Sequence, residues 1–300
     1  MARLLDMAIT TWRRKHEYDV AQVDVFSGPS FCGLKSLPGY CGGVGKPVVL
    51  TLHGGHLPVF AQQQPGRVTR LLNKAQVVTA PSPFLYEQMK SYRSDLLLLP
   101  NAIDLTHYVF QLRARPQPRL IWLRAFHQIY NPSLAPRILA QLVHEFPDIQ
   151  LIMVGPDKGD GSLLETQRVA AALGVAERIE YPGRVAKEDV PLWLNKGDIF
   201  LNTTHIDNTP ISVMEAMACG LCVVSTNVGG LPYLLTDEQD ALLIEPDSVE
   251  QGAAAIRRIL SQPDLAAHLS QNAYHKVRQF DWPIVLKQWQ ELLLSLCTHA

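Results

Sequence analysis

Residues 200–235 read FLNTTHIDNTPISVMEAMACGLCVVSTNVGGLPYLL, and they contain the clearest structural pattern of the chain. An apolar strand ends near Asn202, a polar loop follows, and an apolar helical pattern begins at Pro210. We expect Thr209 to cap this helix and Pro210 to take its first position, because a proline there lacks only a donor that would have no partner anyway. The stretch therefore predicts a strand, a loop and a helix of a parallel α/β sheet.

The start of this helix has the properties of an anion site. The backbone N–H groups of Ile211, Ser212 and Val213 would point out of the helix, where the macrodipole also favours negative charge, so a phosphate fits there. Glu215 lies just over one turn further on and leans back toward the same end, where it can accept hydrogen bonds from the hydroxyls of a ribose or another sugar. Asp207, in the loop, is a second carboxylate directed at this place. For either carboxylate alone, the alternative interpretation is that it is an ordinary residue of a solvated loop or helix face, without a role in binding.

The rest of the chain alternates short apolar runs with amphipathic stretches, which is typical of parallel strands joined by crossover helices. Strands are expected at residues 19–26, 47–53, 76–80, 96–99, 119–123, 149–154, 178–181, 199–202, 222–225 and 241–244. Helices are expected at residues 83–92, 132–146, 161–173, 188–195, 210–219, 249–260, 265–277 and 282–297. The segment QLRARPQPR (111–119) predicts a domain boundary. We therefore expect domains over residues 1–112 and 113–281, and a closing helix over 282–300.

The composition excludes several classes of protein. Apolar residues make up 47% of the 300, which is enough for a large core, and a formal net charge of −1 argues against a nucleic-acid-binding protein. Charged residues within the first twenty positions interrupt any signal peptide or membrane span, so we expect a cytoplasmic protein. The five cysteines indicate reduced thiols. Cys219 and Cys222 have no second Cys or His pair nearby, so we expect them to be buried and structural, with no metal site.

Residues 207–232, DNTPISVMEAMACGLCVVSTNVGGLP, resemble the donor-binding signature of retaining GT-B glycosyltransferases of the family 4 type (glycosyl transferases group 1), in which seven residues separate two acidic ones. Further pieces agree in order and spacing: VVLTLHGG (48–55), VVTAPSPF (77–84), LLPNAID (98–104), LIMVGP (151–156) and IEYPGRVAKEDVPLWL (179–194). The resemblance implies an α/β GT-B fold, in which two Rossmann-like, doubly wound domains face a cleft. Residues 1–112 would form the acceptor-side domain and 113–281 the nucleotide-sugar-binding domain, with 282–300 crossing back to the first.

The resemblance also implies a role for each matching residue. His53 would face the donor sugar across the cleft, Asp207 would face the same sugar, and Arg124 would neutralise the donor diphosphate, which makes these three the implied catalytic residues. Glu215 would bind the ribose hydroxyls. Backbone contacts to the diphosphate and sugar are implied for Asn208, Thr209, Pro210, Ile211 and Ser212, and contacts to the nucleobase for Gly183, Arg184 and Val185.

Three features depart from the family pattern. Asp207 is one methylene shorter than the usual Glu. Arg124 is followed by AFHQIYNP, without the Lys that the family places about five residues later, so His127, Tyr130 or Asn131 would substitute. The usual first strand and glycine-rich loop are not found, so we expect an incomplete N-terminal domain whose sheet lacks its central strand.

The implied function is a retaining, metal-independent hexosyltransferase that moves a sugar from a nucleoside diphosphate to a hydroxyl of a glycan, lipid or small molecule. No cofactor is expected beyond the donor substrate. The implied partners are a nucleotide-sugar donor and a glycan or lipid-linked acceptor, with no nucleic acid. Peripheral association with the inner face of a membrane is left open. Two alternatives also remain open: a catalytically weak or inactive nucleotide-sugar-binding module, and a GT-B epimerase.

Overall fold

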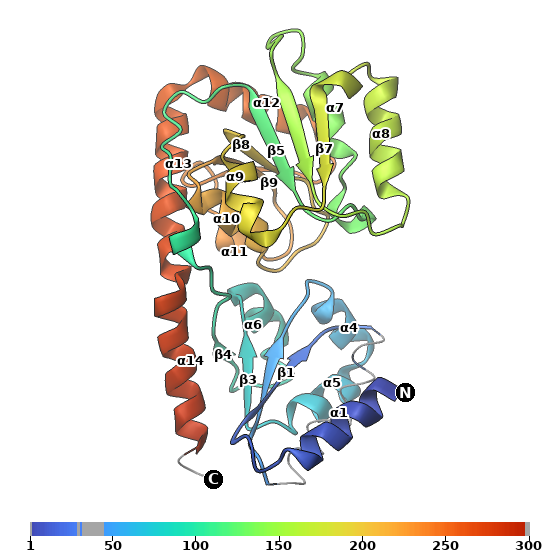
Figure 1. The fold of residues 1–300 in the computed structure, drawn as a ribbon, viewed down its shortest axis with the longest axis vertical. Coiled ribbons are helices and arrows are strands. Elements are labelled where there is room, and N and C mark those ends of the chain that lie inside the picture. Colours follow the sequence, from blue (N-terminus) through green and yellow to red (C-terminus); the bar gives the residue numbers. More distant parts are fainter. Residues whose placement is uncertain (1, 29–30, 32–44, 298–300) are drawn as a thin grey trace. The chain divides into compact units, whose positions relative to one another are not determined.

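The computed structural model describes residues 2–28, 31 and 45–297 of the 300-residue chain. It divides into two compact units, Met1–Ala102 together with Pro283–Ala300, and Ile103–Trp282. Each unit contains one parallel β-sheet, as Figure 1 shows.

The first unit is built on four strands whose order in the sheet follows the chain, β1-β2-β3-β4. These are β1 (Ala21–Val25), β2 (Val48–Leu52), β3 (Val77–Ala80) and β4 (Leu97–Leu98). The helices described in it are α1 (Ala2–Arg13), α4 (Leu57–Gln63), α5 (Pro65–Leu72), α6 (Pro83–Met89) and the part of α14 (Trp282–Cys297) that begins at Pro283. The strand order does not reverse among these four strands, so they contain no switch point of the kind at which open α/β sheets bind ligands.

The second unit has six parallel strands in the order β10-β9-β8-β5-β6-β7. These are β5 (Arg119–Leu123), β6 (Gln150–Val154), β7 (Ile179–Gly183), β8 (Ile199–Asn202), β9 (Cys222–Thr226) and β10 (Leu242–Ile244). Its α-helices are α7 (Leu134–Ala140), α8 (Ser162–Ala172), α9 (Val190–Leu194), α10 (Ile211–Ala218), α11 (Leu231–Leu234), α12 (Val249–Ser261) and α13 (Pro263–Val277). The strand order reverses between β5 and β8, as in a Rossmann sheet.

Both faces of the six-stranded sheet are covered by apolar side chains. One core includes Trp122 and Leu151 from the strands and packs with residues of α7, α8 and α12. The other includes Phe200 and Val223 and packs with residues of α9, α10 and α13. The central strands β8 and β9 are buried along their whole length, which explains why they read as continuous apolar runs. This double covering fixes the ends of β5 and β8, from which the loops of the site begin.

All ten expected strands are found, with ends that differ by no more than two residues. The eight expected helices are also found, although the one expected at residues 132–146 is regular only over Leu134–Ala140, and the one expected at 188–195 begins as a 3-10 turn (Lys187–Asp189). Four helices were missed, namely α1, α4, α5 and α11. The last three are no longer than eight residues, too short for a helical period to stand out from the surrounding loop.

The division between the units falls after Ala102, ten residues before the expected one after residue 112. The intervening segment packs on the second unit: the Gln111 N–H donates to the Cys219 carbonyl (3.2 Å), and the buried Arg113 forms an ion pair with Asp198 (2.8 Å). The prolines and arginines that resemble a linker are therefore part of this unit's structure.

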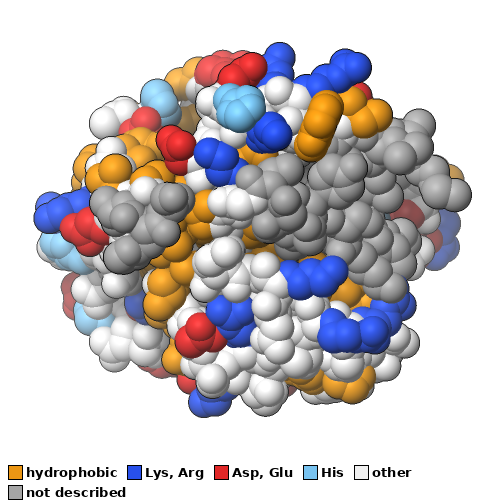
Figure 2. Space-filling view, turned by 90° about the horizontal axis from the view of Figure 1, so that it is seen from below, with side chains coloured by type: hydrophobic (Ala, Val, Ile, Leu, Met, Phe, Trp, Pro, Cys, Tyr) orange, Lys and Arg blue, Asp and Glu red, His pale blue; other side chains and the backbone are white. Residues whose placement is uncertain are grey.

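The helix α14 begins at Trp282, as expected, and from Pro283 onward it groups with the first unit. An apolar stripe runs along this helix, in which Val285 is buried and Trp282 is exposed, while Leu286, Trp289, Leu292 and Leu293 are partly buried. Within the described ranges, no helix combines the length and the apolar character that a membrane crossing requires. On the described part of the face in Figure 2, Lys and Arg side chains stand in small groups among uncharged and acidic ones.

Candidate functional site

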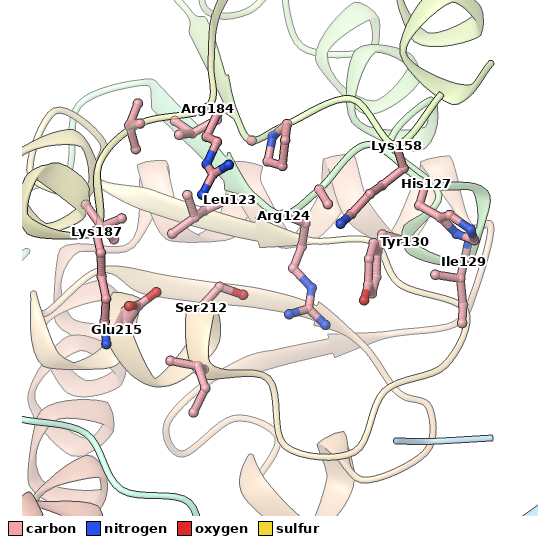
Figure 3. Close-up of a pocket in the computed structure, with 17 residues that line it drawn as sticks. Leu123, Arg124, His127, Ile129, Tyr130, Lys158, Arg184, Lys187, Ser212 and Glu215 are labelled. Atoms are coloured by element: carbon pink, nitrogen blue, oxygen red, sulfur yellow. The ribbon is translucent and has the colours of Figure 1, made fainter. Parts of the chain in front are cut away.

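A cavity of about 760 Å³ lies at the carboxyl ends of β5, β6 and β7, next to the point where the strand order reverses. All the residues that line it belong to the second unit. They come from the loops after these three strands and from the start of α10, and Figure 3 shows them. The chain therefore places its cavity where a Rossmann sheet binds ligands.

The helix α10 begins at this cavity, and Ile211 and Ser212 line it. Thr209 does not cap the helix and Pro210 is not its first residue: Pro210 itself is the cap residue, because its ψ of 119° is extended, and no side chain caps the helix. The Val213 N–H is not free either, since it donates to the Pro210 carbonyl (3.1 Å). Of the three amides expected to bind an anion at the start of α10, those of Ile211 and Ser212 are left to do so. The Ser212 hydroxyl is buried there without a hydrogen-bond partner in the described chain.

Arg124 follows β5 and lines the cavity, and its guanidinium forms an ion pair with Asp207. The guanidinium also lies over the Tyr130 ring, with 4.2 Å between its central carbon and the ring centroid. Burial lowers the pKa of Arg124, and its Nε has no partner in the described residues. Asp207 in turn accepts a hydrogen bond from the Asn208 N–H (2.9 Å). The arginine is thus held on two sides, and its Nε–H is left as a buried donor.

Glu215 lines the cavity from α10 and is buried, with 7% of its surface exposed. The Tyr108 hydroxyl donates a hydrogen bond to its Oε1 (2.8 Å). Burial raises the pKa of Glu215, while the hydrogen bond from Tyr108 and the charges of Lys187 and Arg124 lower it. Burial likewise raises the pKa of Tyr108, which therefore remains a donor. The second carboxylate oxygen is available to accept hydrogen bonds from a ligand.

The loop that carries Asp207 rests on Gly229 and Gly230. The Gly230 N–H donates to the Asp207 carbonyl (3.0 Å). A Cβ atom on Gly230 would stand 1.8 Å from the Asn208 carbonyl oxygen, and one on Gly229 would stand 2.2 Å from that of Asp207. The glycine pair of the signature is therefore required by close backbone packing against the acidic loop.

We expect Gly230→Ala to lower the free energy of unfolding by about 3 kcal/mol, because backbone has to move to admit the methyl group. Urea unfolding measures this. The matched control is Gly174→Ala in the same unit, where φ is 69° but a Cβ meets nothing within 4 Å, so that about 1 kcal/mol is expected. A loss for Gly230→Ala no larger than that for Gly174→Ala would contradict the packing argument.

The structure places the other predicted residues as follows. Arg184 and Val185 line the cavity, and Gly183, at the end of β7, accepts a hydrogen bond from the Gly155 N–H (2.9 Å). Asn208 and Pro210 are buried beside the start of α10, and Thr209 is partly buried. Of the three substitutes for the missing lysine, His127 and Tyr130 line the cavity, whereas the Asn131 amide is bonded to Asp247 (2.8 Å) outside the lining.

His53 lies in the first unit, directly after β2. Its Nε2 is 3.2 Å from Asp24 Oδ1, and its ring stacks on Phe26 with 5.1 Å between centroids. Its backbone N–H donates to the Val25 carbonyl (2.8 Å), so the ring position is set by the neighbouring strand β1. The role implied for His53 stays a prediction.

Sequence reasoning missed Lys158, Lys187 and Tyr108. Lys158 and Lys187 line the cavity, the first in the loop after β6 and the second in the 3-10 turn after β7. Both follow the carboxyl end of a strand in the predicted sheet, which is the signal that could have found them. Tyr108 carried no such signal, because it lies in the segment that was interpreted as part of the other domain.

The cysteines agree with their expected structural role: Cys219 and Cys222 are buried, and burial raises the pKa of each thiol to about 12. Among the side chains that the structure describes, no cluster of three or more His, Cys, Asp or Glu could hold a metal ion.

The fold is shared with solved structures. The fold superposes on Anabaena HepE in complex with UDP and glucose with a TM-score of 0.82, at 19% identity, over 97% of this chain and 81% of that one. It superposes on sucrose-phosphate synthase from Thermosynechococcus elongatus with a TM-score of 0.80, at 20% identity, over 99% of this chain and 79% of that one. The protein has the GT-B fold, with two parallel sheets of four and six strands.

The family model for glycosyl transferases group 1 matches residues 111–276, and the chain belongs to this family. Among curated proteins, it is 29% identical over 175 residues to D-inositol 3-phosphate glycosyltransferase of Mycobacteroides abscessus, over 58% of this chain and 38% of that protein. It is 28% identical over 196 residues to a phosphatidylinositol N-acetylglucosaminyltransferase subunit of Arabidopsis thaliana, over 64% of this chain and 42% of that protein. The chain thus spans about two fifths of the length of these relatives.

Proposed function

We propose that the protein is a retaining glycosyltransferase that moves a hexose from a nucleoside diphosphate to an acceptor hydroxyl. The observation that supports this most directly is the cavity itself. It brings the two available amides of α10, the guanidinium of Arg124 and the carboxylate of Glu215 to one place, at the reversal point of a Rossmann sheet. Family membership supports the same reaction class.

Each part of the cavity has a place in this reaction. The Ile211 and Ser212 amides and Arg124 bind the diphosphate, and they stabilise the negative charge that grows on it as the bond between the sugar and the phosphate oxygen breaks. The free oxygen of Glu215 accepts hydrogen bonds from the ribose hydroxyls. The acceptor oxygen attacks the same face of the sugar that the diphosphate leaves, which gives retention. Asp207 and His53 are proposed to face the transferred sugar, and Gly183, Arg184 and Val185 the nucleobase.

We further propose that the reaction needs no metal ion, because amides and Arg124 take the part that a cation would otherwise have on the diphosphate. The acceptor belongs to the class of glycan, lipid or small-molecule hydroxyls, and the names of the two curated relatives both contain an inositol, which makes inositol phosphates suitable first acceptors to test. A cytoplasmic location is supported by the unpaired, buried thiols of Cys219 and Cys222.

Calorimetry with UDP, GDP and ADP tests the proposal, followed by turnover of the matching nucleotide sugars with and without EDTA. UDP comes first, since HepE is solved with UDP and glucose. We expect binding of one nucleoside diphosphate and transfer of its sugar with the anomeric configuration kept, unchanged by the chelator. Binding without transfer would favour the inactive binding module, conversion of the donor into its epimer would favour an epimerase, and no binding would exclude all three.

A further inference from the structure

The cationic side chains around the cavity differ in what compensates their charge. Arg124 is paired with Asp207, and Lys187 lies close enough to Glu215 to lower the pKa of that carboxyl. Lys158 and Arg184 also line the cavity, and no described carboxylate forms an ion pair with either of them. Lys158 is exposed to solvent and stands at the site without an ion-pair partner among the described residues.

The backbone of Lys158 is fixed next to the segment that carries Arg124. The Lys158 N–H donates to the Phe126 carbonyl (3.1 Å), and the Phe126 N–H donates to the Pro156 carbonyl (2.9 Å). These two bonds form a parallel bridge between the loops after β5 and β6. Figure 3 shows the Lys158 side chain directed into the cavity, toward Tyr130 and Arg124.

The acidic neighbours of Lys158 are engaged by backbone amides. Asp157 accepts a hydrogen bond from the Gly159 N–H (2.9 Å). Asp160 accepts from the Gln128 N–H (2.7 Å) and, through its other oxygen, from the Ser162 N–H (3.1 Å). These bonds hold Asp160 through both oxygens and Asp157 through one, and neither carboxylate forms an ion pair with Lys158.

We propose that Lys158 binds the phosphate group of the donor that is farther from the nucleoside. The inference rests on the proposed function. In Figure 3, Glu215 lies on one side of Arg124 and Lys158 on the other, so a donor whose ribose is at Glu215 extends its second phosphate past Arg124 toward Lys158. A diphosphate carries more charge than the paired Arg124 can neutralise, and an ammonium on a flexible stem can follow a phosphate as it leaves.

The comparison of UDP with UMP tests this assignment, because UMP lacks the second phosphate. By calorimetry on the full chain, we expect Lys158→Ala to weaken UDP binding by about tenfold or more and to leave UMP binding within about twofold of wild type. Lys158→Arg should keep most of the UDP affinity. If wild type selects another base, the corresponding diphosphate and monophosphate are used.

The matched control is Arg184→Ala, which removes from the same cavity a charge that likewise has no ion-pair partner among the described residues and should not change the ratio of UDP to UMP affinity. An unchanged ratio in Lys158→Ala would overturn the assignment while leaving the proposed function intact. Failure of wild type to bind any nucleoside diphosphate would overturn both.

Discussion

Replacing Arg124 by alanine is expected to lower kcat/KM for sugar transfer by about 10²–10³-fold. The guanidinium is the strongest donor aimed at the proposed diphosphate position, and loss of one such preorganised donor has effects of this size. Its geometry is fixed by Asp207 on one side and the Tyr130 ring on the other, so Arg124→Lys, which keeps the charge without the planar contact, should retain only part of the activity.

A loss of activity could also come from the carboxylate left behind, since Asp207 is largely buried, with 13% of its side chain exposed. The double variant Arg124→Ala with Asp207→Ala separates the two effects. It should regain unfolding free energy relative to Arg124→Ala alone, because no buried charge stays unpaired, but it should not regain affinity for the nucleoside diphosphate. Recovery of that affinity in the double variant would show that Arg124 acts only by neutralising Asp207.

The second large effect is expected at Glu215. Glu215→Ala should weaken nucleoside diphosphate binding by about ten- to hundredfold, which corresponds to the loss of about 1–3 kcal/mol of buried hydrogen bonding. Calorimetry with a ribonucleotide and with its 2′,3′-dideoxy analogue identifies the group of the ligand that Glu215 binds. If the carboxylate holds the ribose hydroxyls, the analogue should bind the variant and wild type alike. Tyr108→Phe is the matched control, because it removes the hydrogen bond at Oε1 and leaves the second oxygen in place.

The pH dependence of ribonucleotide binding provides an independent test of the role of Glu215. The ionised carboxylate is the better acceptor, and burial raises its pKa, so ribonucleotide affinity should fall with decreasing pH before 4.5, the ordinary value, is reached. Lys187 lowers this pKa, and Lys187→Met should therefore shift the fall to higher pH. If ribonucleotide affinity falls at the same acidic pH in wild type and in Glu215→Gln, the group that titrates is not Glu215.

The sheet was predictable from sequence because buried parallel strands leave continuous apolar runs, and residues 199–202 and 222–226 are such runs. The start of α10 was placed within one residue, yet its cap was wrong, since a proline fits both the first helical position and the extended cap. The pairing of Tyr108 with Glu215 joins residues 107 positions apart, and no local pattern records such a contact. Lys158 was overlooked for a different reason: although it follows the carboxyl end of a predicted strand, it lies in a glycine-containing loop whose composition indicates only a turn.

The ion pair between Arg124 and Asp207 means that the proposed site contains its own anion. Under the proposed function, a diphosphate would exchange with this carboxylate instead of entering an unoccupied pocket. The free energy of diphosphate binding then depends on the difference between two interactions of Arg124, one with the diphosphate and one with Asp207. The affinity therefore stays moderate even where each interaction is strong. The same competition works in reverse after transfer, when Asp207 can recapture the arginine and hasten the departure of the spent nucleotide.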